Sequence, residues 1–328
     1  MHPGKVSNSI LKRSVFKRLK SKNKLISSKP AMGLDCTHIN TQGGNVLSCV
    51  SYGNFAVFKA ANNIASCGGM PVAAQCAVIM PVDFDERVLK DIVSQIDSEC
   101  AYFGMQISGG RTLVSDKVNE PVVTITGIGI AEADVNVSAA NAKPGQDIVM
   151  TKHIGISGIR MIAELKKNEI ESIYTTEFLE QAVADISDMS VQKEASVALG
   201  CGVNAMHDVN EGGIFAALWN MAEAAGAGID VDCRKITVKQ EIIEICEMFD
   251  INPYELESAG SLLIAADNGY QLVEKLKENG ITAQVIGAFT KGNQRIIRNQ
   301  DEIRYLDVPK TDEINRFKAD ILFKDEKE

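Results

Sequence analysis

Short apolar segments alternate with amphipathic helical segments along most of this chain, and this alternation restricts the fold more than any other feature. The short runs have the length of strands, and apolar residues recur every three or four positions in the stretches between them. The pattern predicts a mixed α/β or α+β protein. Strands are expected at residues 45–49, 73–80, 106–108, 122–130, 229–231, 261–266, 283–288 and 295–298, and short apolar runs lie at 148–150 and 203–206.

A turn at Lys143-Pro144-Gly145-Gln146 divides the chain, because composition and apolar period both change there. The 328 residues are enough for two domains. We therefore expect a basic arm over residues 1–30, an N-terminal domain over 31–142, a C-terminal domain over 143–310 and a tail over 311–328.

Charge is unevenly distributed along the chain. The formal net charge is −9, yet residues 1–30 carry nine Lys and Arg side chains and no acidic residue. Such an arm could contact phosphates, nucleic acid or the protein's own acidic surface. No series of aromatic residues accompanies the basic ones, which disfavours binding of single-stranded nucleic acid. We expect a solvated or self-docked arm, with phosphate contacts as the alternative and no nucleic-acid partner.

A charge-free stretch from Ala60 to Val82 is long enough to resemble a membrane span. Polar, glycine and proline residues interrupt it: Asn62, Asn63, Gly68, Gly69, Pro71 and Gln75. We interpret the stretch as a buried strand and loop, and expect no membrane partner. Residues 1–30 also lack the apolar core of a secretory signal, which predicts a cytoplasmic protein.

The cysteine pattern does not predict a metal or redox motif. Eight cysteines are present, but no two are spaced as CxxC. Cys36, His38 and Cys49 lie near strands but lack a fourth ligand. The preferred interpretation is free thiols that act as small buried hydrophobic groups.

The segment Met206–Gly213 is the most specific motif. It follows a strand and begins a helix, so the backbone amides of Gly212-Gly213 could approach an anion. Asp208 and Glu211 could hold a metal ion or orient a ligand. The alternative is an ordinary helix start, capped by Asp208 or Asn210, with Glu211 interacting with the helix dipole.

Other glycine-rich or polar turns are weak signals individually, because such turns are common after strands. They are Gly33-Leu34-Asp35-Cys36, Asn62–Pro71, Ser108-Gly109-Gly110-Arg111-Thr112 and Gly155-Ile156-Ser157-Gly158.

Taken in order, these motifs resemble the aminoimidazole ribonucleotide synthetase (PurM-like) superfamily, and most closely its HypE-type, hydrogenase-maturation-related branch. The similarity covers roughly residues 1–300. The matching segments are Gly4-Lys5-Val6, Leu11-Lys12-Arg13, Lys143-Pro144-Gly145, His207–Gly213, Asn252–Leu256 and Ser258–Leu262.

The resemblance implies a PurM-like fold of two α/β domains and a homodimer whose N-terminal sheets join into a barrel. It implies ATP and Mg²⁺ as ligands, and ATP-dependent phosphoryl transfer or dehydration in a maturation or biosynthetic pathway, with a maturation protein as a further partner. Asp208 and Glu211 become the candidate catalytic residues, and Asp35 and Asp208 the candidate metal ligands. The candidate cofactor-binding residues are Asp35, Asn63, Gly109, Gly110, Arg111, Gly155, Gly158, Gly212 and Gly213.

Three acids that the resemblance leads us to expect are replaced. Val50 stands where the family has a Thr-Asp pair, Asn63 where it has Asn-Asp, and Leu113 where it has a His-Thr-Glu type. Neutral residues remove charge that binds Mg²⁺, so ATP turnover should be weakened. We expect these three positions to converge at one cleft near Asp35, where Arg111 could contact phosphate directly.

The end of the chain also departs from the HypE pattern, which closes on a cysteine that accepts the carbamoyl group. Here the last residues are Phe323–Glu328, so chemistry on a C-terminal cysteine is not expected. The alternative to a weakened enzyme is therefore a degenerate, non-catalytic homologue that binds a nucleotide or a partner protein.

Overall fold

The computed structural model describes residues 6–26, 29–183 and 185–325. Gly4 and Lys5 of the opening motif and the last three residues lie outside these ranges. The chain forms two compact units. The N-terminal unit comprises the described residues of 22–29 and 35–136, and the C-terminal unit those of 1–21, 30–34 and 137–328.

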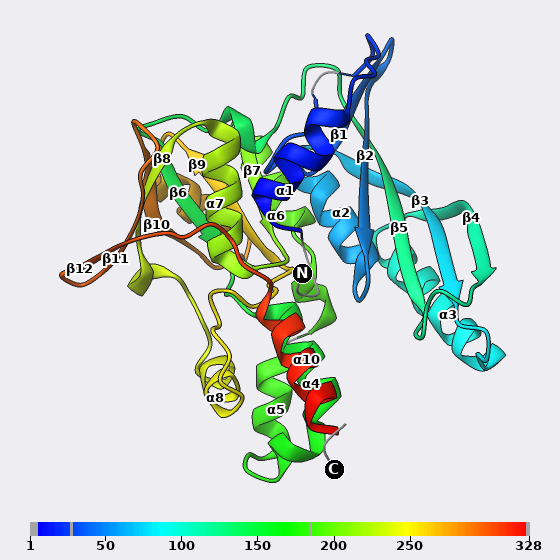
Figure 1. Ribbon diagram of the computed structural model, residues 1–328. Helices are drawn as coiled ribbons and strands as arrows, with labels where there is room; N and C mark the ends of the chain where they lie inside the picture. Colours follow the sequence, from blue (N-terminus) through cyan, green and yellow to red (C-terminus); the bar gives the residue numbers. More distant parts are fainter. Residues whose placement is uncertain (1–5, 27–28, 184, 326–328) are drawn as a thin grey trace. The chain divides into compact units, whose positions relative to one another are not determined.

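The N-terminal unit is built on a five-stranded sheet with the order β1-β2-β5-β3-β4 (Figure 1). Only β3 and β4 are parallel within it. The strands are β1 (Thr37–Thr41), β2 (Gly44–Tyr52), β3 (Met70–Met80), β4 (Gln106–Val114) and β5 (Val122–Ala131), and the helices are α2 (Ala56–Ser66) and α3 (Glu86–Tyr102).

Helix α2 covers one face of this sheet. The thiol of Cys49 on β2 donates to the carbonyl of Ala60 at 3.4 Å. On β5, a methyl group at Gly127 would lie 3.0 Å from the Ala60 side chain, so the glycine permits close packing. Side chains on the opposite face are exposed, Val50 among them at 66%.

Two expectations for this unit were wrong. The charge-free stretch contains helix α2 as well as a strand, because nearly every residue of Ala56–Ser66 is buried and no polar stripe reveals the helical period. The glycine pair predicted to form a loop after residue 108 instead lies inside β4, which continues to Val114.

The C-terminal unit contains a separate seven-stranded sheet with the order β12-β11-β8-β10-β6-β9-β7. All its pairs are antiparallel except β11 with β8. The strands are β6 (Asp147–Thr151), β7 (Ala205–Val209), β8 (Gly228–Asp232), β9 (Ser261–Ala266), β10 (Ala283–Thr290), β11 (Arg295–Asn299) and β12 (Glu302–Tyr305). The two separate sheets confirm the expected two-domain α/β architecture.

The core of the C-terminal unit includes Ile148, Met150 and Ile286 from the sheet, and Ile214 and Leu218 from a helix that packs on it. The helices of this unit are α4 (Ile156–Glu171), α5 (Thr176–Val183), α6 (Gln192–Gly200), α7 (Gly213–Ala225), α8 (Gln240–Met248), α9 (Gly269–Glu278) and α10 (Glu313–Asp325). Helix α10 lies where we expected only a tail, and it begins with the buried residues Glu313 and Ile314.

The basic arm contains a short helix, α1 (Asn8–Ile10), followed by further helical turns to Arg18. Lys12 pairs with Glu223 of α7, and Glu223 also accepts from Arg295 at 2.7 Å. The guanidinium of Arg295 lies 3.7 Å from the ring centroid of Trp219. The arm therefore contacts the rest of the C-terminal unit through Lys12, as expected of a self-docked arm.

In the described part of the chain, no helix is long and apolar enough to cross a bilayer.

Candidate functional site

The junction between β7 and α7 contains the most strongly buried acid of the predicted site. Strand β7 is entirely buried and pairs with β9, and Asp208 near its end is only 2% exposed. The Asn210 side-chain amide donates to Asp208 Oδ2 at 2.6 Å. The other polar atom of Asn210, Oδ1, is buried and has no hydrogen-bond partner among the described residues.

These oxygen atoms fit a hard divalent cation. Mg²⁺ prefers carboxylate and amide oxygen ligands, and a buried acceptor without a donor is costly unless a ligand satisfies it. Asp208 and Asn210 supply such atoms, and the half-buried Glu211 follows directly in the chain. The junction could therefore hold Mg²⁺. Asp208 and Glu211 also interact with other groups of the protein.

The glycine pair after Glu211 is required by the backbone. Gly212 and Gly213 have φ values of +82° and +63°, which side chains disfavour. A methyl group at Gly213 would lie 2.6 Å from the carbonyl oxygen of Tyr254. The pair therefore lets α7 begin directly against the segment that follows α8.

The amides of this pair are not free for a phosphate, contrary to the sequence-based expectation. Gly212 donates to the carboxylate of Asp312, and Gly213 donates to the carbonyl of Asn210 at 3.0 Å. The anion at the start of α7 is thus supplied by the chain itself. Nothing in the local sequence indicated Asp312, which lies one hundred residues further on.

The second predicted phosphate loop is likewise occupied by internal contacts. Gly155 donates to Ser258 Oγ at 2.7 Å, and Gly158 donates to the carbonyl of Glu257 at 2.9 Å. A methyl group at Gly158 would lie 2.4 Å from Leu256. The two glycines allow close packing of the backbone, and their amides bind groups of the protein in place of a phosphate.

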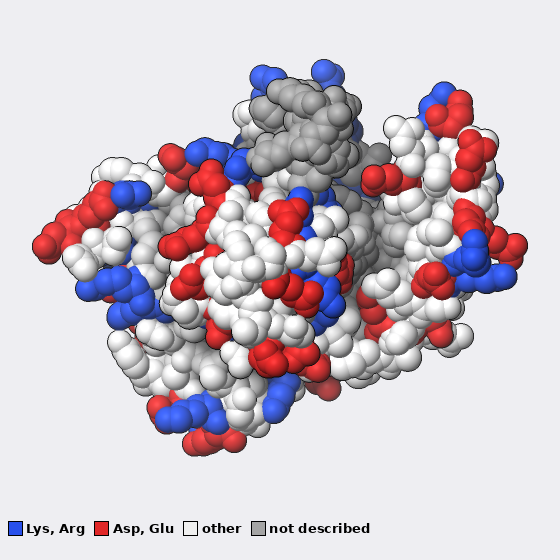
Figure 2. Space-filling view, turned by 90° about the horizontal axis from the view of Figure 1, so that it is seen from below, with Lys and Arg blue, Asp and Glu red and all other residues white. Residues whose placement is uncertain are grey.

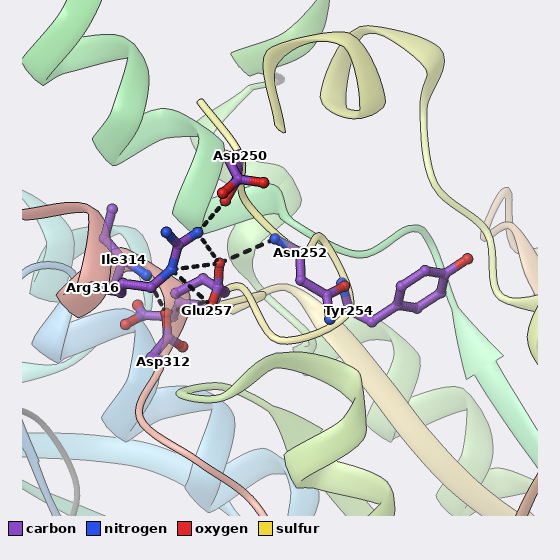
Figure 3. Close-up of polar contacts among 8 residues, drawn as sticks. Asp250, Asn252, Tyr254, Glu257, Asp312, Ile314 and Arg316 are labelled. Atoms are coloured by element: carbon purple, nitrogen blue, oxygen red, sulfur yellow. Dashed lines mark hydrogen bonds and ion pairs between the residues drawn. The ribbon is translucent and has the colours of Figure 1, made fainter. Parts of the chain in front are cut away.

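Asp312 is the charged centre of this packing (Figure 3). It is 1% exposed and accepts from the amides of Ile314 at 2.8 Å and Glu257 at 3.3 Å. Burial raises the pKa of Asp312 to about 7, with a contribution from the nearby Glu257, while the amides of Gly212 and Ile314 act in the opposite direction.

The adjoining residue secures the start of α10. Glu313 accepts from the amide of Asn252 at 3.1 Å and pairs with Arg316 at 2.6 Å. Arg316 also donates to the carbonyl of Asp250, as Figure 3 shows. Helix α10 is therefore attached to the 250–257 segment by charged hydrogen bonds at its first turn.

A pocket of about 380 Å³ opens beside the start of α7. Phe215 and Tyr254 both line it, and their rings are stacked with centroids 5.1 Å apart. Its polar lining includes Asn252, Glu255 and Arg304. The sequence did not predict this pocket, because its wall combines α7 with segments up to Thr311.

In the N-terminal unit, Gly109, Gly110 and Arg111 lie on strand β4. Gly110 has φ +152°, and a methyl group there would meet the backbone of Cys76 on β3 at 1.9 Å. Gly110 is thus needed for strand pairing, which corrects its prediction as a ligand loop. Arg111 is exposed and makes no ion pair within the part of the chain that the structure describes.

The expected convergence of Val50, Asn63 and Leu113 is wrong for this unit. Val50 is on β2 and Leu113 on β4, with β5 and β3 between them, which amounts to about 14 Å across the sheet. Asn63 is on α2, which packs against the face opposite Val50. The strand order and the position of α2 therefore separate residues that the resemblance placed together.

Asp35 is half-buried and precedes a group of thiols in the N-terminal unit. Cys36 is hydrogen-bonded to Cys49 and to Cys67. These bonds, that with Cys49 first, raise the pKa of Cys36. The hydrogen bond from Cys36 lowers the pKa of Cys67 to about 6, helped by His38 and opposed by burial.

Charge on the face shown in Figure 2 is mixed. Acidic and basic side chains are interspersed there, and the described part of that face carries no continuous basic stripe. Nucleic-acid binding needs such a stripe or patch. The expectation that nucleic acid is not a partner stays a prediction.

Several curated relatives are named as hydrogenase expression/formation proteins or as carbamoyl dehydratase HypE. The putative hydrogenase expression/formation protein of Methanocaldococcus jannaschii is 28% identical over 75% of this chain and 72% of its own length. Carbamoyl dehydratase HypE of Cupriavidus necator is 25% identical over 70% of this chain, which spans 66% of that protein, slightly under two thirds.

Solved structures share the fold. HypE in complex with ATP has a TM-score of 0.70 and 16% identity, covering 95% of this chain and 97% of that chain. HypE in a HypE-HypF complex has a TM-score of 0.67 and 22% identity, covering 83% and 93%. At these identities, the likeness establishes the fold.

Two family matches together cover most of the chain. Residues 30–131 match the N-terminal domain, and residues 143–298 the C-terminal domain, of AIR synthase related protein. With its PurM-like fold and its HypE relatives, this chain belongs to the AIR synthase related family.

Proposed function

We propose that this protein binds ATP and uses it in a HypE-like phosphoryl transfer or dehydration within a maturation or biosynthetic pathway, at a reduced rate. The observation that carries the proposal is the oxygen cluster after β7, where Asn210 Oδ1 is buried without a partner beside Asp208. The relatives named carbamoyl dehydratase and the fold shared with ATP-bound HypE support it.

The proposed roles follow from position and charge. Asp208 binds the cation, because its buried carboxylate is oriented by Asn210, and Glu211 orients the reacting group. Mg²⁺, when bound, would neutralise phosphate charge. In the N-terminal unit, Asp35 is proposed as a metal ligand, Asn63 as a nucleotide contact and Arg111 as a phosphate contact.

Calorimetry with Mg-ATP, followed by an assay of ADP release, tests this function. We expect Asp208→Asn to weaken ATP binding with Mg²⁺ present much more than with Mg²⁺ absent, because it removes a charged oxygen ligand. Asp301→Asn is the matched control, since Asp301 is exposed in the β11–β12 turn. Equal affinity for wild type and Asp208→Asn in both conditions contradicts the proposal.

A non-catalytic homologue is the second candidate. It is favoured by the neutral residues at positions 50, 63 and 113, where the resemblance calls for acids. In that case ATP binds without ADP release, and affinity depends mainly on cations such as Arg111. Affinity would then fall steeply as salt is added, and Arg111→Ala would flatten this dependence.

A second copy of this chain is the proposed primary partner. The sheet face opposite α2 exposes large apolar side chains, including Val50, Tyr52, Leu113, Val122 and Ile130. Exposed apolar patches of this kind mark association surfaces. A maturation protein is proposed as a further partner, since HypE has been solved in complex with HypF.

A further inference from the structure

The pocket beside the start of α7 has no role in the proposed function. Its volume of about 380 Å³ falls within the range of about 300–1,000 Å³ that is typical of small-molecule sites. Its walls come from the first turn of α7, the 252–255 segment, the end of β11 and residues 304–311. All of these segments belong to the C-terminal unit, so the pocket is formed within that unit.

Part of the pocket lining is apolar and aromatic. Ile297 and Leu306 are buried, and the half-buried rings of Phe215 and Tyr254 stack with an angle of 11° between their planes. Figure 3 shows the Tyr254 ring pointing away from the contacts of Arg316. Aromatic rings add free energy of association when a further ring packs against them in an offset or edge-to-face arrangement. This part of the lining therefore favours a ligand with a planar ring.

The charged residues of the lining balance one another. Glu255 and Asp307 are acidic, whereas Arg304 and Lys310 are basic. Arg304 is paired with Glu302 at 2.8 Å. The Glu255 carboxylate and the Lys310 ammonium make no hydrogen bond or ion pair within the part of the chain that the structure describes. The pocket thus offers one half-buried carboxylate and one ammonium group to a ligand that carries both signs of charge.

Glu255 is the polar group that gains most from a ligand. Burial raises the pKa of Glu255, and Lys310 acts in the opposite direction. A half-buried carboxylate without a donor costs free energy, which the ammonium group of a ligand would offset. Asn252 Oδ1 accepts from the amide of Tyr254 at 3.1 Å, so the NH₂ group of Asn252 is left as a donor for an anionic group.

We propose that this pocket binds a free aromatic amino acid. The ring packs against Phe215 and Tyr254, the α-ammonium group pairs with Glu255, and the α-carboxylate binds Lys310 and the side-chain amide of Asn252. A nucleoside triphosphate fits less well, because a triphosphate needs several cationic donors and the second basic residue of the lining already has an acidic partner. The inference goes beyond the proposed function, since it requires neither ATP nor Mg²⁺.

The first experiment uses the full wild-type chain and separates the three parts of the ligand. Calorimetry compares L-phenylalanine, L-tyrosine and L-tryptophan. The one that binds most tightly is then compared with its decarboxylated amine, with its deaminated acid and with L-alanine, which lacks the ring. We expect one amino acid per chain and at least about 10-fold weaker binding of each incomplete probe. No binding by any of the three amino acids, or equal binding of the incomplete probes, overturns the proposal.

A variant then assigns the acidic partner. Glu255→Gln should weaken binding of the amino acid by at least about 10-fold, because a charged hydrogen bond is lost. Binding of the deaminated acid should not weaken, since that probe has no ammonium group. Glu274→Gln is the matched control, because Glu274 is an exposed acid on α9 outside the pocket. An equal loss for the amino acid and for the deaminated acid overturns the role of Glu255.

The basic partner is tested in the same way. Lys310→Gln should weaken binding of the amino acid but not of the decarboxylated amine, which has no carboxylate to bind. Lys291→Gln is the control, since Lys291 is exposed between β10 and β11 and does not line the pocket. Unchanged affinity for the amino acid in Lys310→Gln overturns the assignment of Lys310.

Alkylation of the wild type locates the ligand. Cys233 lines the pocket and is half-buried, whereas Cys201 is exposed and lies outside it. A saturating amino acid should slow alkylation of Cys233, read by peptide mass, and leave the rate at Cys201 unchanged. Equal rates at Cys233 with and without the amino acid overturn the location. Displacement of the amino acid by ATP without Mg²⁺ assigns the pocket to the nucleotide and also overturns the proposal.

Discussion

The two sheets differ in how much of their surface they bury, and this difference indicates which of them has a face available for association. Strands β7 and β9 of the C-terminal unit are buried at every residue, as expected where both faces are covered. In the N-terminal unit β2 alternates between buried and exposed residues toward its end, and β4 is exposed almost throughout. Strands β7 and β9 are thus covered on both faces, whereas the N-terminal sheet offers an uncovered face.

The largest expected effect tests the close packing of the C-terminal unit. Gly213→Ala should reduce the free energy of unfolding by about 3–4 kcal/mol, because the methyl group adds backbone strain and a clash with Tyr254. Gly202→Ala is the control: its φ is +80°, but no atom lies within 4 Å of the added methyl group. It should cost about 1 kcal/mol.

Denaturant unfolding followed by circular dichroism measures both losses. Similar values for the two variants would show that strain alone matters and that the packing at the start of α7 can relax.

The next effect is a pH dependence that belongs to the C-terminal unit. The pKa of Asp312 is raised from about 3.8 to about 7, so the folded state holds a proton that the unfolded state has lost. Stability from this group is complete below pH 4, falls as the pH rises toward 7, and is constant above that. The expected loss is on the order of a few kcal/mol.

Unfolding experiments at pH 5 and pH 8 check this dependence, with Asp312→Asn as the comparison. The variant cannot ionise at this position, so its stability should change less between the two pH values. Equal changes in wild type and variant would assign the dependence to other groups.

A smaller effect on stability, but a clear one on association, is expected at the uncovered N-terminal sheet. Val50→Asp combined with Leu113→Asp should convert a dimer to a monomer, because burying new carboxylates on association is costly. Both side chains are exposed, so monomer stability should change by less than about 0.5 kcal/mol. Light scattering after size-exclusion chromatography gives the molar mass.

Val88→Asp is the control for this pair, since Val88 is an exposed apolar residue on α3, away from the sheet face. Monomerisation by the control as well, or a wild type that is already monomeric, would contradict dimerisation through this face.

Sequence patterns predicted the C-terminal strands well, because buried apolar runs such as Ser261–Ala266 are unmistakable. Strands β1 and β12 were missed, since both lie at sheet edges and are rich in polar residues. Helix α2 was missed for the opposite reason, because burial on nearly all sides hides its period.

The candidate site was predictable only where its residues are neighbours in sequence. Asp208 and Glu211 were found because the strand-to-helix junction is a local motif. Asp312 and Cys67 were not assigned roles, since each reaches its partners through long-range packing that no local spacing encodes.

The smallest expected effect concerns the missing acids. Val50→Asp and Asn63→Asp each add a carboxylate, and the resemblance suggests that together they would rebuild a Mg²⁺ site. In this unit the two residues belong to opposite sides of the sheet, because Cys49 faces α2 and Val50 therefore points away. A double-mutant cycle on Mg²⁺ affinity should give a coupling near zero, within about 0.3–0.5 kcal/mol. Calorimetry of the two single variants and the double variant supplies the cycle. A coupling above about 1 kcal/mol would show that the two carboxylates share one ion, contrary to their placement on opposite sides of the sheet.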